Sequence, residues 1–200
     1  PHHLAQRTFA QTGGGMISGV NRMKKFLVYL FLMLLAIVVS GFYGVCHDQI
    51  SYTVSPEYFT KFKFDQFGLT GMNLPDRARV SIVGFLASWW MGIPIGLLVG
   101  GSGLIHSGHW QMLKVSLMAF GLVIFITFIF GMCGLLYGYV QTKTIILSDY
   151  QGWFIPNDVT DLRRFLCVGY MHNASYLGGV LSIFIACIFQ VVVKIKNAAQ

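Results

Sequence analysis

The sequence FLVYLFLMLLAIVVSGFYGV, residues Phe26–Val45, contains twenty residues and no charged side chain. A helix of that length rises about 30 Å, which matches the thickness of the hydrocarbon core of a bilayer. A cleaved signal peptide is the alternative interpretation, but its apolar core is usually about 7–15 residues long. No A-x-A cleavage site follows the run, so the sequence favours an uncleaved membrane-spanning helix.

Three further apolar runs follow, and none of them contains a charged residue. Each is long enough to cross a membrane as a helix, which predicts spans at residues 80–104, 115–140 and 165–193. Together with the first span at residues 26–45, these runs indicate an all-α, polytopic membrane protein. The expected fold is a four-helix transmembrane bundle with a polar loop at its outer face.

The composition excludes an ordinary soluble domain, because 55% of the residues are hydrophobic and only 10% are charged. The basic residues behind the net charge of +7 lie mainly beside the ends of the apolar runs, where Lys and Arg contact lipid headgroups. The expected partner is therefore the lipid bilayer, with a homo-oligomer or a membrane protein as further partners and no nucleic acid. The four cysteines form no CxxC pair, which argues against a zinc ribbon or a thioredoxin motif.

Residues 1–22 are polar, rich in glycine and without periodicity. We expect a disordered extension or a remnant there, followed by a natural start at Met23 and a single transmembrane domain at residues 23–200. The numbers of Lys and Arg on the two sides of the membrane are nearly equal and do not decide the topology. Because the first helix usually sets the orientation and Lys24 and Lys25 precede it, we expect a bacterial inner membrane protein with a cytoplasmic N-terminus.

The second span carries a small residue at every fourth position, on one face of the predicted helix. Such a stripe lets a neighbouring helix approach closely in lipid, where the hydrophobic effect does not drive association. Pro94 removes one helical hydrogen bond and clashes near the carbonyl group of Trp90, which predicts a kink. The expected packing residues are Gly84, Ser88, Gly92, Gly96 and Gly100.

Polar residues follow the first span and recur within the fourth. His47 and Asp48 leave the first span, whereas His172 and Ser175 are spaced to share one face of the fourth. Polar groups within a span should face the bundle interior, and the predicted topology brings both sets to the outer side of the membrane. The predicted polar cluster consists of His47, Asp48, Gln49, Glu57, Tyr58, His172, Asn173, Ser175 and Tyr176.

This cluster is compatible with three classes of function. The preferred hypothesis is non-enzymatic: the cluster orders the outer loop by hydrogen bonds and binds a small ligand, a lipid headgroup or a partner. The second is a metal-dependent membrane-embedded enzyme acting on a lipid or envelope substrate, since two His and a carboxylate can bind zinc. The third is a proton-coupled small-solute transporter, because His and carboxylate groups can relay protons near neutral pH.

The sequence separates these hypotheses only in part. No HExxH or similar ligand pair occurs, so no metal ligand and no catalytic residue is assigned. The inner half of the predicted bundle offers few polar residues besides Ser88, Thr127 and Gln190, which disfavours a proton path. The candidate ligands for a zinc-like ion are His47, Glu57 and His172.

Three smaller features complete the expectations. Cys46 and Cys167 both lie at outer ends of predicted helices, where a disulfide and two unpaired thiols are both compatible with the sequence. Residues 53–60 contain strand-forming side chains that suit a short hairpin. His106 and His109 occupy the short turn after the second span and are expected at the surface near the headgroups.

Three segments also resemble a known family. HDQ and EYFT in the first loop, ASWWMG in the second span and HNASYLGG in the fourth are similar, in order and spacing, to the hallmarks of an uncharacterised family of small bacterial integral membrane proteins. The resemblance implies a multi-helix protein of the cell membrane and no established activity, substrate or cofactor. In that family a His commonly stands three residues after EYFT; Lys63 occupies this position here, which argues against a metal site. The matching positions are His47, Asp48, Gln49, Glu57, Tyr58, Phe59, Thr60, Trp89, Trp90, His172, Asn173, Ser175 and Tyr176.

Overall fold

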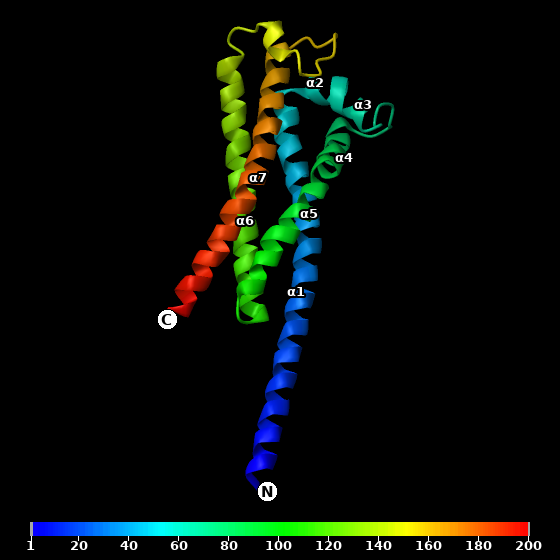
Figure 1. Ribbon diagram of the computed structural model, residues 1–200. Coiled ribbons are helices and arrows are strands. Elements are labelled where there is room, and N and C mark those ends of the chain that lie inside the picture. The colour runs from blue at the N-terminus through cyan, green and yellow to red at the C-terminus, as the bar shows by residue number, and fades with distance from the viewer. Residues whose placement is uncertain (1, 200) are drawn as a thin grey trace.

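The computed structural model describes the backbone of residues 2–199 and the side chains of residues 19–199. Four long helical segments run along the molecule (Figure 1), and no strand occurs in this described part. Four helical segments of the described residues are long and apolar enough to span a membrane: Gly19–Val54, Asp76–Ile105, His109–Gln141 and Leu162–Ala198. The chain is therefore a multi-pass membrane protein, and the predicted all-α four-helix fold is confirmed.

Shorter helical pieces interrupt and connect these segments. The first segment is α1, His2–Val54, and the last two are α6, His109–Gln141, and α7, Leu162–Ala198. The second segment consists of α4 (Asp76–Ser88), the 3-10 turn η2 (Trp89–Met91), α5 (Gly92–Ile95), the π turn η3 (Gly96–Gly100) and the 3-10 turn η4 (Gly103–Ile105). The connections contain α2 (Pro56–Tyr58), the π turn η1 (Phe59–Lys63), α3 (Phe64–Gln66) and the 3-10 turn η5 (Leu147–Tyr150).

The helix α1 is longer than predicted. It ends at Val54 instead of Val45, because His47, Asp48 and Ser51 are buried against other helices and have no need to face water. The hairpin expected at residues 53–60 is wrong, since α1 is followed by α2 and η1. A disordered extension was expected at residues 1–22; the backbone there is helical from His2, while the side chains of residues 1–18 lie outside the described residues.

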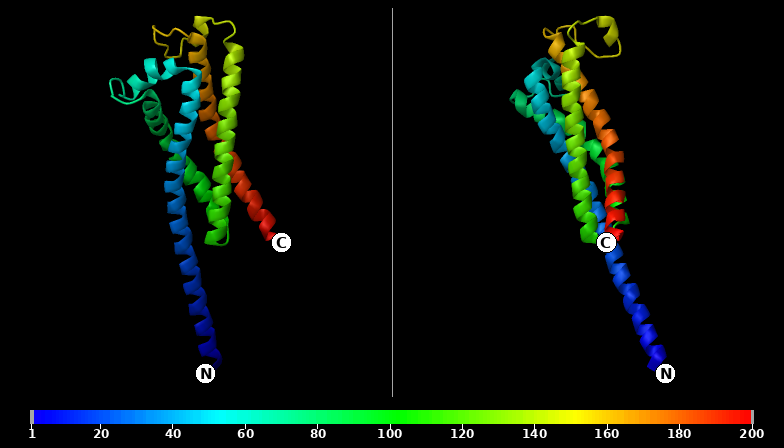
Figure 2. Two further views of the ribbon diagram at one scale, coloured as in Figure 1. Left: turned by 180° about the vertical axis from the view of Figure 1, so that it is seen from behind. Right: turned by 90° about the vertical axis from the view of Figure 1, so that its left-hand side faces the viewer.

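Both chain ends lie at one end of the bundle, and the connections at residues 55–75 and 142–161 lie at the other, the cap end (Figures 1 and 2). Aromatic side chains hold these connections to the helices. Phe59 is fully buried, and the ring centroid of Tyr58 lies 5.0 Å from that of Phe165 on α7. This aromatic cap consists of Tyr58, Phe59, Phe64, Leu69, Val80, Val83, Phe165 and Val168.

The small-residue stripe of the second span lies against α1. A Cβ atom added at Gly84 would overlap the carbonyl oxygen of Gly44, and one added at Gly92 would overlap the backbone of Ile37. The two helices therefore touch backbone to backbone, which only small residues permit. The remaining members of the stripe, Ser88, Gly96 and Gly100, lie against Gly44, Met33 and Leu32.

The second span changes its helix type around Pro94. A 3-10 turn at Trp89–Met91 precedes the proline, and a π turn at Gly96–Gly100 follows it. Because proline has no N–H to donate to the carbonyl group one turn earlier, the hydrogen-bond pattern must change there. The interruption lies where the kink was predicted.

At the end opposite to the cap, side chains of α1 and α7 hold the turn at residues 101–108. Lys25 donates to the carbonyl oxygens of Leu104 and His106 at 2.6 and 2.8 Å, and Lys194 donates to Ser107 at 3.0 Å. His106 is fully buried, so the expectation of a surface histidine is wrong for this residue. Burial lowers the pKa of the His106 imidazole, which favours its neutral form.

An apolar core fills the bundle between this turn and the polar groups nearer the cap. It is built from all four helical segments and includes completely buried Leu32 and Val99. Its buried members are Leu32, Ala36, Ile95, Val99, Met112, Ala119, Phe120, Val123, Ile183 and Ala186.

Candidate functional site

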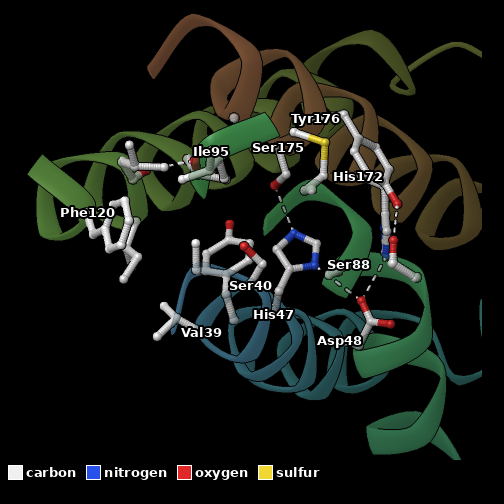
Figure 3. Close-up of a pocket in the computed structure, with 18 residues that line it drawn as sticks. Val39, Ser40, His47, Asp48, Ser88, Ile95, Phe120, His172, Ser175 and Tyr176 are labelled. Carbon is white, nitrogen blue, oxygen red and sulfur yellow. Dashed lines mark hydrogen bonds and ion pairs between the residues drawn. The ribbon is translucent and has the colours of Figure 1, made fainter. Parts of the chain in front are cut away.

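Two helices supply the ionisable side chains of the site. His47 and Asp48 are consecutive on α1, and His172 lies on α7. Nε2 of His172 is 3.1 Å from Oδ1 of Asp48, and Nδ1 of His47 is 3.3 Å from the same oxygen (Figure 3). The two imidazoles meet edge to face with ring centroids 4.8 Å apart. The structure thus brings together three groups that were expected on one side of the membrane.

Two serines hold the His47 ring in place. Oγ of Ser175, on α7, lies 2.9 Å from Nε2 of His47 (Figure 3). Ser51, one turn after His47, donates to its carbonyl oxygen at 3.0 Å and lies 3.5 Å from its Nδ1. The exposed fractions of His47 and Asp48 are 5% and 4%. Because buried polar groups are costly without partners in lipid, this network stabilises the contact between α1 and α7.

The hydrogen bonds of His172 require a proton between its ring and Asp48. Nδ1 of His172 lies 2.9 Å from the carbonyl oxygen of Val168, which can only accept, so Nδ1 carries a hydrogen. A neutral ring would then present the lone pair of Nε2 to Asp48, and an ionised carboxylate also only accepts. The pair is therefore either an imidazolium with a carboxylate or a carboxylic acid that donates to Nε2. In both forms one exchangeable proton lies at the centre of the cluster.

The aromatic cap shields the cluster on the cap side. The ring of Tyr58 stacks on His172, with centroids 5.0 Å apart and 23° between the planes. Tyr58 is buried, and this burial raises the pKa of its hydroxyl above the ordinary value. The side chain that covers His172 is therefore neutral at physiological pH.

A pocket extends from the cluster toward the middle of the bundle. About 770 Å³ of space not filled by atoms lies along it, a figure that includes space open to the surroundings. Polar groups line the end near His172, whereas Ile95, Phe120 and Val39 line the part that lies away from it (Figure 3). Ala36, another lining residue, precedes His47 by about 16 Å of helix rise. The pocket is therefore amphipathic along its length.

Part of the pocket rim lies on the lipid-facing surface. Ile124, near the middle of α6, lines the pocket and is 38% exposed. Tyr176 on α7 also lines it and is 40% exposed. A side chain exposed at the middle of a membrane-spanning helix contacts hydrocarbon and not water. The lining of the pocket therefore reaches the lipid-facing surface at Ile124 and Tyr176.

The hydroxyl group of Tyr43 is the unpaired polar atom of this pocket. It is buried and has no hydrogen-bond partner among the described residues. Tyr43 lies one turn before His47 on α1, and the two ring centroids are 5.8 Å apart. An unsatisfied buried hydroxyl costs about 1–3 kcal/mol, so a ligand that accepts its hydrogen bond would recover this energy.

Two predicted members of the cluster lie outside its centre. Gln49 donates to the carbonyl oxygen of Arg77 at 2.8 Å and to Ser81 at 3.0 Å, so it ties α1 to α4. Asn173 is exposed on α7. Neither side chain is among those that line the pocket.

Tyr176 joins the wall of the pocket and not its ionisable centre. Its hydroxyl donates to the carbonyl oxygen of Ala87 at 3.3 Å, and its ring stacks on Trp90 with centroids 6.2 Å apart. These contacts connect α7 to the second span. Tyr176 therefore closes the bundle between these helices on one side of the pocket.

Glu57 lies at the surface of the cap and away from the ionisable centre. Its carboxylate accepts hydrogen bonds from the backbone N–H groups of Thr160 and Asp161 at 3.1 and 2.8 Å, and from the Thr160 hydroxyl at 2.8 Å. These donors lower the pKa of Glu57 below the ordinary value of a glutamate. Glu57 thus anchors the 142–161 connection, and Asp48 takes the place expected for it beside the two histidines.

We expect Glu57→Gln to release this anchor, because the amide oxygen carries no charge and accepts fewer hydrogen bonds. Since the folded pKa lies below the unfolded one, the carboxylate stabilises the fold above the unfolded pKa and ceases to do so as pH falls through the folded pKa. Amide hydrogen exchange at Thr160 and Asp161 should therefore quicken in the variant at neutral pH, and in the parent protein only in acid. Asp65→Asn, an exposed carboxylate of the same cap, is the control. Equal protection of both amides in Glu57→Gln and the parent would contradict this role.

The two cysteines considered for a disulfide are free thiols. Cys46 is exposed on α1, whereas Cys167 is buried on α7 with its Sγ 3.4 Å from the hydroxyl of Thr142. Of the two alternatives compatible with the sequence, the structure contains the unpaired one.

Tyr43 and Ser51 belong to the site but were not predicted. They lie four residues before and after His47, so all three share one face of α1. This spacing of four residues indicates a shared helix face. The sequence, however, predicted that the first helix ends at Val45, which placed Ser51 in a loop. The length of α1 is therefore what hides Ser51 in the sequence.

Comparisons of the chain with models of protein families, with curated proteins and with solved structures found no match.

Proposed function

We propose that this protein binds an amphiphilic molecule that enters from the lipid phase. The observation that supports this function is the pocket, which has an ionisable cluster at one end, an apolar wall at the other and a lipid-facing rim. The polar group of the ligand would contact His47, His172 and the unpaired hydroxyl of Tyr43. Its chain would lie along Ile95 and Phe120.

The polar end of the pocket supplies most of the affinity in this proposal. An apolar chain gains little by leaving lipid for an equally apolar protein wall, since no water is released. A charged or hydrogen-bonding headgroup gains much more, because it moves from hydrocarbon or the interface to fixed donors in a low-dielectric site. We therefore expect the protein to select ligands by headgroup and to tolerate variation in chain length.

We place the protein in the inner membrane of a bacterium, with the cap end outside and the N-terminus in the cytoplasm. Lys24 and Lys25 at the start of the first membrane-spanning length support this orientation. The resemblance of HDQ, EYFT and HNASY to small bacterial membrane proteins supports the compartment. Proton-coupled transport is less favoured, because the apolar core containing Leu32 and Val99 lies between the cluster and the other end of the bundle.

The test uses the purified full chain in liposomes that contain a fatty acid with a photoreactive diazirine on its acyl chain. After illumination, mass spectrometry should find the probe on pocket-lining residues such as Ile95 and Phe120, and unlabelled fatty acid should compete. Thr127→Trp is expected to abolish this labelling, because it places an indole within the pocket wall.

Phe128→Trp is the matched control, since the neighbouring side chain is 38% exposed and does not line the pocket. It should leave the labelling of Ile95 and Phe120 unchanged. Labelling that persists in Thr127→Trp, or that unlabelled fatty acid does not reduce, would contradict a ligand site. The cluster would then have only the structural role of joining α1 to α7.

A further inference from the structure

We infer that His47, Asp48 and His172 form a binding site for a divalent transition-metal ion of the zinc class, with an open coordination position that faces the pocket. Each of the three residues offers one ligand atom, an imidazole nitrogen or a carboxylate oxygen, and these atoms all lie within 4.8 Å of one another. Nδ1 of His47 and Nε2 of His172 are the nitrogens that lie near Oδ1 of Asp48. The site itself stands on this geometry; only the assignment of the fourth ligand, below, rests on the proposed function.

The separations of the three atoms suit a common metal ion. Bonds of about 2.0–2.2 Å from zinc to nitrogen or oxygen place two tetrahedral ligands about 3.3 Å apart. The observed separations from Asp48 Oδ1 are 3.1 Å to His172 and 3.3 Å to His47. Small side-chain rotations would therefore complete the site without movement of α1 or α7.

The hydrogen bonds around the ligands orient both imidazoles for a metal. Nδ1 of His172 donates to the carbonyl oxygen of Val168, so its Nε2 is directed at the centre of the cluster. Nε2 of His47 lies 2.9 Å from Ser175 Oγ and can donate to it, which leaves Nδ1 free to bind. Metal-binding histidines usually have such a partner on their second ring nitrogen.

Charge balance predicts the nature of the fourth ligand. A divalent ion replaces the proton shared by His172 and Asp48. The single negative charge of the Asp48 carboxylate offsets one of the two positive charges of the ion, so one positive charge remains in a buried site. An isolated buried charge is costly, which favours an anion in the open position. Tyr43, with its unpaired hydroxyl on the pocket wall, can donate a hydrogen bond to that anion. The ligand of the proposed pocket would then be an amphiphile with an anionic oxygen headgroup, a carboxylate or a phosphate.

The experiment titrates the chelator-treated full chain in detergent with Co²⁺, a spectroscopic stand-in for zinc. We expect one Co²⁺ per chain, a visible absorption typical of four coordination, displacement by Zn²⁺ and release of at least one proton per metal ion. Asp48→Asn should weaken binding at least about tenfold, because it keeps the shape of the side chain but removes the ligand charge. His109→Ala, at the start of α6 at the other end of the bundle, should bind as the parent does.

Two results would overturn the metal site. One is the absence of stoichiometric Co²⁺ binding by the parent protein, which is decisive even if a variant fails to fold. The other is equal binding by parent and Asp48→Asn when both show the same helicity and elution volume. The headgroup assignment is tested by adding a fatty acid or an alkyl phosphate to the Co²⁺-loaded protein, since an anion that joins the metal changes its absorption; no change with either would overturn that assignment.

The metal site and the amphiphile site can fail separately. Photolabelling of Ile95 and Phe120 in chelator-treated protein without Co²⁺ binding would remove the metal and leave the pocket ligand. Co²⁺ binding without photolabelling would remove the amphiphile and keep the metal site.

Discussion

His172→Ala is expected to lower the free energy of unfolding of this protein in detergent micelles by about 3–5 kcal/mol, the usual cost of removing one partner of a buried ion pair. The side chain of Asp48 is 6% exposed, and the variant leaves it with one of its two histidine partners, His47. The stacked ring of Tyr58 loses its support at the same time. Unfolding by a graded increase of a denaturing detergent, followed by circular dichroism, measures the change.

Asn173→Ala provides the matched control, because it truncates the next residue of the same helix but at an exposed position. We expect it to change the free energy of unfolding by no more than about 0.5 kcal/mol. Losses of similar size in both variants would mean that α7 as a whole, and not the contact with Asp48, determines the stability.

Gly92→Ala should destabilise the protein by about 1–3 kcal/mol or more, although it adds one methyl group. The new Cβ atom would overlap the backbone of Ala36 and Ile37 on α1, and backbone atoms cannot rotate away as a side chain can. The second span would have to move away from α1 in the region where these two helices form a wall of the pocket. Thermal unfolding in detergent measures the effect, and reduced photolabelling of the pocket is expected with it.

Gly121→Ala is the control for this substitution, since a Cβ at that position of α6 meets nothing within 4 Å. Alanine is favoured over glycine within a helix by about 0.5–1 kcal/mol, so the control should be neutral or slightly stabilising. Equal stability of Gly92→Ala and Gly121→Ala would contradict the close packing of the second span on α1.

The fold follows from features that act within short stretches of sequence. Uncharged runs of sufficient length predict the spans, and a repeat of four predicts the small face that includes Gly84 and Gly92. The same reasoning placed the end of the first span too early, because a polar sequence that begins at His47 resembles a loop. Within a bundle, polar residues can remain helical when another helix supplies partners, as Ser175 does for His47.

The composition of the site depends on contacts that the sequence does not specify. His47, Asp48 and His172 were predicted together from topology, but Glu57 was grouped with them only because it is close in sequence. Its actual partners, Thr160 and Asp161, come from the other connection at the cap end. The unpaired hydroxyl of Tyr43 is equally hidden, since it depends on how the four segments enclose the pocket.

The most direct test of the central claim is a double-mutant cycle between α1 and α7, made with Asp48→Asn, His172→Ala and the combined variant in metal-free protein. If the two side chains form one buried contact, their effects on the free energy of unfolding should be coupled by about 1–3 kcal/mol, with the combined variant more stable than the sum predicts. Effects that add to within about 0.5 kcal/mol would show that the two groups do not meet, and the site described above would not exist.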